Sequence, residues 1–161
     1  MEFEERLQKA IERGYRRGDA RAEEEAARAM SEDELKSLHS RYRLRLSEHI
    51  EACIRRRPTH FPGFEVETIY GERGWGAACR RDDLRLFSRT QRESYYSRLE
   101  ITVRPYSHLH VLELNARGTV HNRELFNRQH YKPLAEVSLD DFLDRVDTWV
   151  LEYAELYAAK S

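Results

Sequence analysis

Three histidines in the second half of the chain have the residue type and spacing of a metal site. His108 and His110 alternate on one side of an extended segment, and His121 follows on the next segment. Three converging imidazoles suit Zn²⁺. If residues 116–118 form a three-residue loop with a left-handed glycine, His121 faces away from the other two. A two-residue turn would bring all three together but would leave that glycine without a role. We therefore expect no metal site and no cofactor.

The same register places Glu113 opposite His121, with arginines nearby. A carboxylate beside an imidazole can act as a general acid and base on an anionic substrate. A cross-strand ion pair has the same sequence pattern, however, and no nucleophile motif such as G-x-S-x-G accompanies this pair. Glu113 and His121 are therefore weak catalytic candidates for a small enzyme, which is one alternative function.

Glycine and cysteine give no stronger candidate for chemistry. Gly71, Gly74 and Gly76 are closely spaced, but no helix with a Lys-Ser or Lys-Thr pair follows them, as a phosphate-binding loop requires. Cys53 falls on an apolar helix stripe, where cysteine behaves as a small hydrophobic residue. His49 lies on the same side, so we interpret it as a core or edge histidine.

Polar positions on one face of the expected sheet collect arginines and one aromatic ring. Many proteins that bind single-stranded RNA stack bases on such rings and hold phosphates with cations. The chain has 28 basic and 29 acidic residues and a formal net charge of -1, which gives no field that attracts nucleic acid. Nucleic-acid binding is thus a less favoured alternative, with the candidate residues Arg85, Phe87, Arg98, Arg104 and Arg123.

The segment between the last expected strand and the final helix is predicted to be a loop that binds a partner. It combines aromatic, amide and cationic groups, and arginine and tyrosine are enriched at binding hot spots. Alternatively, its aromatic rings close the end of the sheet. The candidate residues are Phe126, Asn127, Arg128, His130, Tyr131 and Lys132.

Helical periodicity covers the first 57 residues. Phe3, Leu7, Ile11 and Tyr15 recur every four positions and share one helix face. Two glycines, at positions 14 and 18, predict the end of this first helix, and a capping box at residues 31–34 predicts a new start, although one long helix from residue 20 is an alternative. The second apolar stripe consists of Leu35, Leu38, Tyr42, Leu46, Ile50, Cys53 and Ile54.

From residue 64 to about residue 125 the apolar period changes to two, in six runs joined by short turns. This pattern predicts an antiparallel meander of five to six strands. A two-residue turn at positions 106 and 107 would pair Val103 with His110. The core face would then contain Leu84, Leu86, Leu99, Ile101, Val103, Leu112, Leu114 and Val120.

Ser138 is expected to cap a final amphipathic helix that packs on this core face. Residues 136–161 carry seven acidic and two basic side chains, whereas residues 35–57 carry two acidic and seven basic ones. Either both charged faces are solvated, or the two helices lie side by side with opposite charges along their seam.

We therefore predict an α+β protein, with an N-terminal helical arm at residues 1–30 and one domain at residues 31–161. The mean hydropathy of -0.85 excludes a membrane span. An acidic N-terminus and two widely separated cysteines favour the cytoplasm. The leading hypothesis is a non-enzymatic protein-interaction module. Because the arm has too few apolar residues to be stable alone, we expect it to need a partner, and we predict a homodimer through the N-terminal helices.

Overall fold

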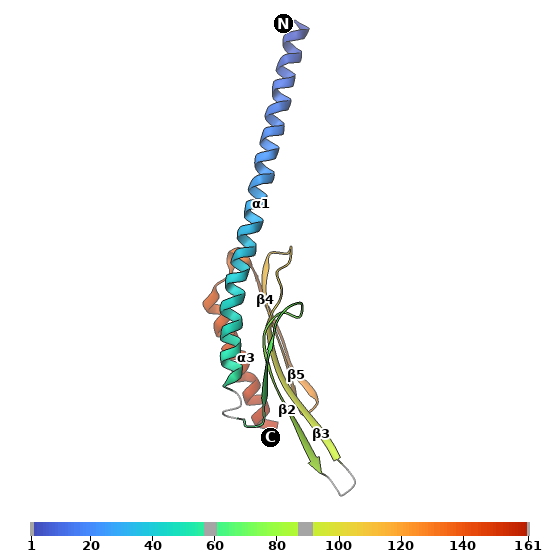
Figure 1. Ribbon diagram of the computed structural model, residues 1–161, viewed down its shortest axis with the longest axis vertical. Coiled ribbons are helices and arrows are strands. Elements are labelled where there is room, and N and C mark those ends of the chain that lie inside the picture. Colours follow the sequence, from blue (N-terminus) through green and yellow to red (C-terminus); the bar gives the residue numbers. More distant parts are fainter. Residues whose placement is uncertain (1, 57–60, 87–91, 161) are drawn as a thin grey trace. The chain divides into compact units, whose positions relative to one another are not determined.

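The computed structural model describes residues 2–56, 61–86 and 92–160 (Figure 1). Side-chain burial is described throughout these ranges except at residues 27–30, 84–86, 92 and 93. The elements follow the order helix, five strands, a short 3-10 turn and a final helix. The predicted α+β class, with N-terminal helix, antiparallel meander and C-terminal helix, is confirmed. The chain divides into two units, Met1–Ser37 and Leu38–Ser161.

Helix α1 spans Phe3–Arg55 without interruption. The predicted helix end near Gly14 and Gly18 and the predicted new start at residue 31 are both wrong. A glycine inside a helix costs only about 1 kcal/mol relative to alanine, and the Ala, Glu, Arg and Leu residues around these two are strong helix formers. In the first unit, every described residue from Glu2 to Ala26 is exposed.

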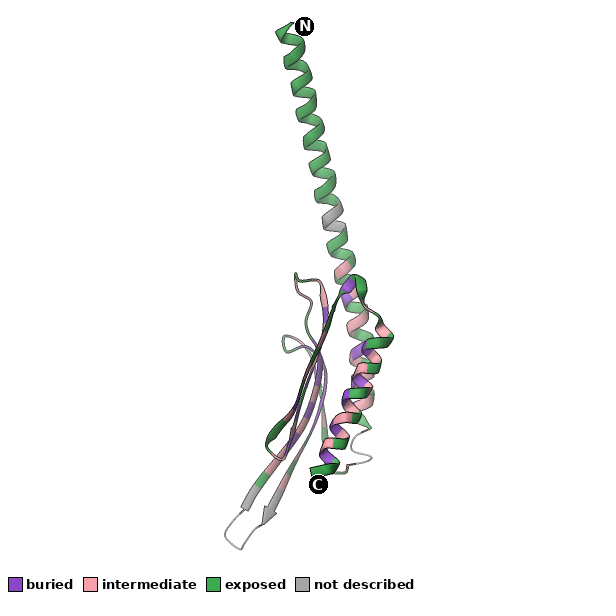
Figure 2. Ribbon diagram, turned by 180° about the vertical axis from the view of Figure 1, so that it is seen from behind, coloured by how far each residue is buried: buried purple, intermediate pink, exposed green. Residues whose placement is uncertain are grey.

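The second unit begins with the last part of α1, whose buried residues recur at helical spacing. His39, Leu46, Ile50 and Ile54 are each at most 2% exposed. Helix α3, Leu139–Lys160, buries the matching stripe Phe142, Val146, Trp149, Tyr153 and Tyr157. Within the second unit, the two helical segments lie side by side on one face of the sheet (Figures 1 and 2). Of the two alternatives for the charged helices, the one that places them side by side agrees with this arrangement, whereas opposite charges along their seam stay a prediction.

The sheet has five antiparallel strands in the order β1-β2-β3-β4-β5. The six predicted runs correspond to five strands, because the second and third runs form one strand, β2. The strands are β1 Glu65–Ile69, β2 Trp75–Leu86, β3 Arg92–Val103, β4 Val111–Val120 and β5 Arg123–Pro133, and the 3-10 turn η1 is Leu134–Glu136.

The register between β3 and β4 differs from the predicted one. Val103 lies opposite Leu114 rather than His110. The connection is longer than a two-residue turn: the Arg104 N–H donates to the Glu113 carbonyl (2.9 Å) and His110 has a φ of 56°. Because the displacement of four residues is even, each side chain keeps its predicted face. The predicted core residues whose burial is described are each at most 2% exposed: Leu99, Ile101, Val103, Leu112, Leu114 and Val120.

The turn between β4 and β5 is also displaced from the predicted position. Residues 116–118 lie inside β4, and the chain reverses at His121 and Asn122, which have φ of 48° and 69°. Two positive φ values in succession define the tight hairpin turn in which asparagine is favoured. The Asn122 amide donates to the Ser94 carbonyl (2.8 Å) and accepts the Tyr96 N–H (2.9 Å), which ties the turn to β3.

The segment from Phe126 to Lys132 is therefore part of β5 and not the predicted loop. The physical reason is the longer β4, whose residues 111–120 take this segment as their partner strand.

Candidate functional site

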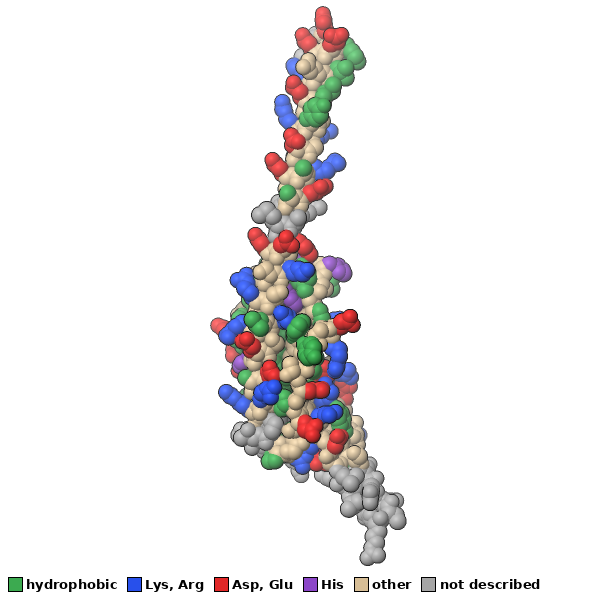
Figure 3. Space-filling view, in the orientation of Figure 1, with side chains coloured by type: hydrophobic (Ala, Val, Ile, Leu, Met, Phe, Trp, Pro, Cys, Tyr) green, Lys and Arg blue, Asp and Glu red, His purple; other side chains and the backbone are tan. Residues whose placement is uncertain are grey.

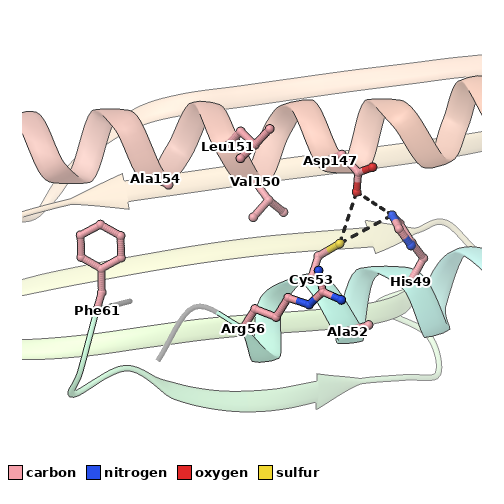
Figure 4. A pocket seen from close by; sticks show the side chains of 9 residues that line it. All are labelled: His49, Ala52, Cys53, Arg56, Phe61, Asp147, Val150, Leu151 and Ala154. Carbon is pink, nitrogen blue, oxygen red and sulfur yellow. Dashed lines mark hydrogen bonds and ion pairs between the residues drawn. The ribbon is translucent and has the colours of Figure 1, made fainter. Parts of the chain in front are cut away.

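Three potential metal-ligating side chains meet where α1 and α3 lie against each other. His49 and Cys53 are one helical turn apart on α1, and Asp147 comes from α3 (Figure 4). The N–H of His49 Nε2 donates to Asp147 Oδ1 across 2.7 Å. The Cys53 thiol donates to the same oxygen across 3.4 Å, and its sulfur lies 3.6 Å from His49 Nε2. The three donor atoms thus form a closed triangle.

The surroundings of the Cys53 thiol favour its protonated form. Burial has the largest effect, and the hydrogen bond to Asp147 and the negative charge of that residue add to it. Together they raise the pKa of the Cys53 thiol from 9.0 to about 11. The thiolate is the nucleophilic form of cysteine, and this one is disfavoured at neutral pH. In the free protein, the cluster therefore lacks the property that a cysteine nucleophile needs.

A groove with a volume of about 820 Å³ extends from this cluster along the seam between the helices. Asp147 and Cys53 point toward each other at one end of the labelled group, and Phe61 lies at the other end (Figure 4). The remaining lining is mostly apolar and consists of Ala52, Arg56, Val150, Leu151 and Ala154. The cluster is thus open to a small molecule from one side.

The predicted pair of Glu113 and His121 does not exist. Glu113 lies opposite Tyr131, because the hairpin turns at residues 121 and 122. The His121 ring packs edge-on against Tyr95 and Tyr157, with ring centroids 5.4 and 6.0 Å apart. A general acid/base pair of these two residues is therefore excluded by the register.

Glu113 instead accepts hydrogen bonds on the sheet face opposite the helices. The donors are Asn115 (3.1 Å), Gln129 (2.7 Å) and Arg104 (3.1 Å). Burial opposes ionisation of Glu113, but the three hydrogen bonds and the Arg104 charge outweigh it and hold the pKa of this carboxyl below its usual value. A carboxylate held in its ionised form is suited to a structural network rather than to proton transfer.

The arginines predicted to bind nucleic acid are divided among different environments. Arg98 lies 2.8 Å from the Glu67 carboxylate, and Arg104 lies 3.1 Å from that of Glu113. Arg123 is exposed at the start of β5. Arg85 is in β2, where side-chain burial is not described, and Phe87 lies outside the described residues. Acidic partners neutralise two of the four arginines, so nucleic-acid binding gains no support and stays a prediction.

The residues predicted as a partner-binding loop alternate between the two faces of β5. Phe126 is buried in the core, and the Arg128 guanidinium donates to Glu152 on α3 (2.7 Å). The His130 ring lies 4.7 Å from that of Phe142. The other three, Asn127, Tyr131 and Lys132, are exposed. Two of the six predicted residues, Arg128 and His130, thus contact α3 of their own chain, and Phe126 belongs to the core.

The spacing of His49 and Cys53 was a sequence signal for this cluster, although both residues also fit the apolar side of their helix. Histidine and cysteine four residues apart on a helix share one face and can ligate the same atom. The third member, Asp147, is 94 residues beyond Cys53 and can be identified only from the packing of α3.

Comparisons with protein-family models, with curated proteins and with solved structures found no match. Within the described part of the chain, no helix has a long enough apolar run to cross a bilayer.

Proposed function

We propose that this protein is an interaction module that self-associates through the first part of α1. The observation that supports this proposal is an exposed apolar face on a helix in the first unit. Phe3 and Tyr15 are 74% and 73% exposed, and Leu7 and Ile11 are each 48% exposed. Figure 3 shows hydrophobic side chains gathered along one side of the N-terminal end of this helix. Contiguous exposed apolar patches on soluble proteins mark interaction sites.

The apolar face has a ridge of large side chains next to a groove of small residues, the shape that helix packing requires. The four large side chains form a ridge at spacing four, and Ala10, Gly14 and Gly18 form a row of small residues beside it. An alanine side chain at either glycine would meet nothing within 4 Å in its own chain. A ridge on one helix packs into the groove between neighbouring rows of another helix. Ridge and groove on one surface are complementary to a second copy of that surface.

The charges beside the face agree with pairing between two identical, parallel helices. With 3.6 residues per turn, Arg6, Arg13 and Arg17 lie along one edge of the apolar face, and Glu4, Glu12 and Asp19 lie along the other. In a parallel two-fold pair, the basic edge of each helix meets the acidic edge of its partner, and each ridge meets a groove. An antiparallel pair would place like edges together. The proposed partner is therefore a second copy of this chain in parallel orientation.

A charge placed on the apolar face should prevent this association. We expect Ile11→Glu to reduce dimer affinity by at least about tenfold, because the carboxylate would be desolvated at the centre of the interface. The measurement is the mass from light scattering coupled to gel filtration, over a series of loading concentrations. Circular dichroism on the same samples reports whether the helix content is retained.

Ala20→Glu is the matched control, because it adds the same charge to the exposed side of the helix away from the apolar face. This variant should associate like the unmodified protein. Equal masses for both variants and the unmodified protein at every concentration would contradict the proposed interface.

A further inference from the structure

We propose that His49, Cys53 and Asp147 form a binding site for a divalent transition-metal ion, best matched by Zn²⁺. All three residues belong to the second unit, so this site is independent of the proposed self-association. Their ligating atoms lie within 4.8 Å of one another. Each residue offers a different donor: imidazole nitrogen, sulfur and carboxylate oxygen.

Two of the three distances between the donor atoms match a tetrahedral ion. With bonds of about 2.3 Å to sulfur, 2.05 Å to nitrogen and 2.0 Å to oxygen, tetrahedral geometry separates sulfur from either other donor by about 3.5 Å, and nitrogen from oxygen by about 3.3 Å. The observed sulfur distances are 3.6 Å to His49 Nε2 and 3.4 Å to Asp147 Oδ1. The nitrogen–oxygen distance is 2.7 Å, the length of the hydrogen bond that the ion would replace.

The set of donors selects the class of metal. Mg²⁺ and Ca²⁺ prefer oxygen ligands throughout, whereas a mixed sulfur, nitrogen and oxygen set is typical of Zn²⁺. Binding releases the thiol proton of Cys53 to solvent, and His49 binds as a neutral imidazole whose one ring proton is on Nδ1, since neither donor atom can carry a proton. Before an ion binds, His49 and Cys53 each donate a hydrogen bond to Asp147. These two hydrogen bonds are lost on binding, because their donor and acceptor atoms become ligands of the ion.

The scaffold holds the three ligands in place before an ion binds. Ile50 and Ile54 anchor this part of α1 in the core with 0% exposure. Val146 and Trp149 flank Asp147 on α3 and are 0% and 4% exposed. Because the ligands project from two packed helices rather than from loops, forming the site requires little ordering.

Three protein ligands leave a fourth tetrahedral position for water or another donor. The groove of about 820 Å³ begins at these same residues and continues past Val150 and Leu151. A small molecule with one donor atom and an apolar body would match both the open position and the groove. The site is therefore of the open type rather than a closed structural type.

Titration of the full-length protein with Co²⁺ after treatment with a chelator tests the site directly. Cobalt in a tetrahedral site with a thiolate ligand gives a sulfur-to-metal charge-transfer band and intense visible d–d bands. We expect one ion per chain, and we expect Zn²⁺ to displace the cobalt spectrum.

Ligand variants locate the ion. We expect Cys53→Ser to remove the charge-transfer band, and Asp147→Asn and His49→Ala to weaken Zn²⁺ binding by at least about 100-fold. Asp147→Asn preserves the size of the side chain, so it keeps the test valid if either change on α1 disturbs folding. Circular dichroism reports folding for each variant.

Two control variants separate this site from other donors of the described chain. Cys79 is a buried thiol in β2, and His108 is an exposed histidine outside the cluster. Cys79→Ala and His108→Ala should retain the full cobalt spectrum. Absence of the band in the unmodified protein, its survival in Cys53→Ser, or its loss in either control would overturn the proposed site.

Discussion

Glu113 shows how a single residue can be correctly placed on a face and wrongly assigned a role. Alternation predicted that it faces away from the core, and this is correct. Its partners depend on the register, and the displaced turn puts Gln129 beside it instead of His121. The carboxylate accepts three hydrogen bonds and is only 12% exposed. It therefore stabilises the sheet while ionised.

The depressed pKa of Glu113 predicts a specific dependence of stability on pH. A carboxyl whose pKa is lower in the folded state stabilises the protein above its unfolded pKa, and this contribution is lost as the pH falls through the folded pKa. We expect the free energy of unfolding of the unmodified protein to fall more steeply than that of Glu113→Gln between about pH 5 and pH 3. Urea denaturation at a series of pH values measures the difference. A difference between the two proteins that stays constant over this range would disprove the role of Glu113.

The cluster of His49, Cys53 and Asp147 marks the limit of prediction at the residue scale. The spacing of the first two is visible in the sequence, and it places them on one helix face. Their assignment to the core stripe was reasonable, because Cys53 is half-buried and Ile54 next to it is fully buried. The third residue joins them only through tertiary packing, which no local pattern encodes.

At the scale of elements, alternation predicted strand faces well and strand registers poorly. A register that moves by two or four residues leaves every side chain on its face, so the buried residues were predictable while the turns were not. Gly118 was the misleading signal. Its expected role was a left-handed turn, whereas it lies inside β4, where a Cβ would be 2.7 Å from Tyr153 Cδ2 on α3.

The close packing of Gly118 against α3 predicts that Gly118→Ala destabilises the second unit. The Tyr153 ring cannot easily withdraw, because its hydroxyl donates to the Thr119 carbonyl across 2.6 Å. On the other side, the added Cβ would lie 2.9 Å from Phe126 Cβ. We expect a loss of about 1–3 kcal/mol in the free energy of unfolding, measured by urea denaturation.

Gly18→Ala is the comparison variant for this change, because a Cβ at that position meets nothing within 4 Å. It should leave the unfolding midpoint of the second unit unchanged. An unchanged midpoint in Gly118→Ala as well would contradict the close contact between Gly118 and the Tyr153 ring.

In helix α1, the sequence predicted breaks that the structure does not have. Its breaks were predicted from Gly14, Gly18 and a capping box, which are local signals of moderate strength. The helix formers around them prevail, and α1 continues to Arg55. The two glycines then have no conformational role in the described chain, and their place beside Leu7 and Ile11 on the exposed face is consistent with the approach of a second helix.

For the whole molecule, the division into an arm at residues 1–30 and a domain at residues 31–161 stays a prediction. The structure separates Met1–Ser37 from Leu38–Ser161, and the buried residues among those whose burial is described all lie in the second unit. Composition predicted that the first unit has little to bury, and its described residues are exposed as far as Ala26. What the sequence alone does not give is the partner of the apolar face, because association depends on surface relief and on charges that must meet across two chains.

Sedimentation equilibrium of the full-length protein tests the proposed self-association most directly. The chain has a mass of 19.2 kDa. We expect the weight-average mass to rise with concentration, from that value toward twice that value, over the range from about 1 to 100 μM, which is typical of a moderate affinity. The rise should stop at the dimer, because a two-fold interface uses the same face on both copies. A mass of 19.2 kDa at every concentration would contradict the proposed dimer.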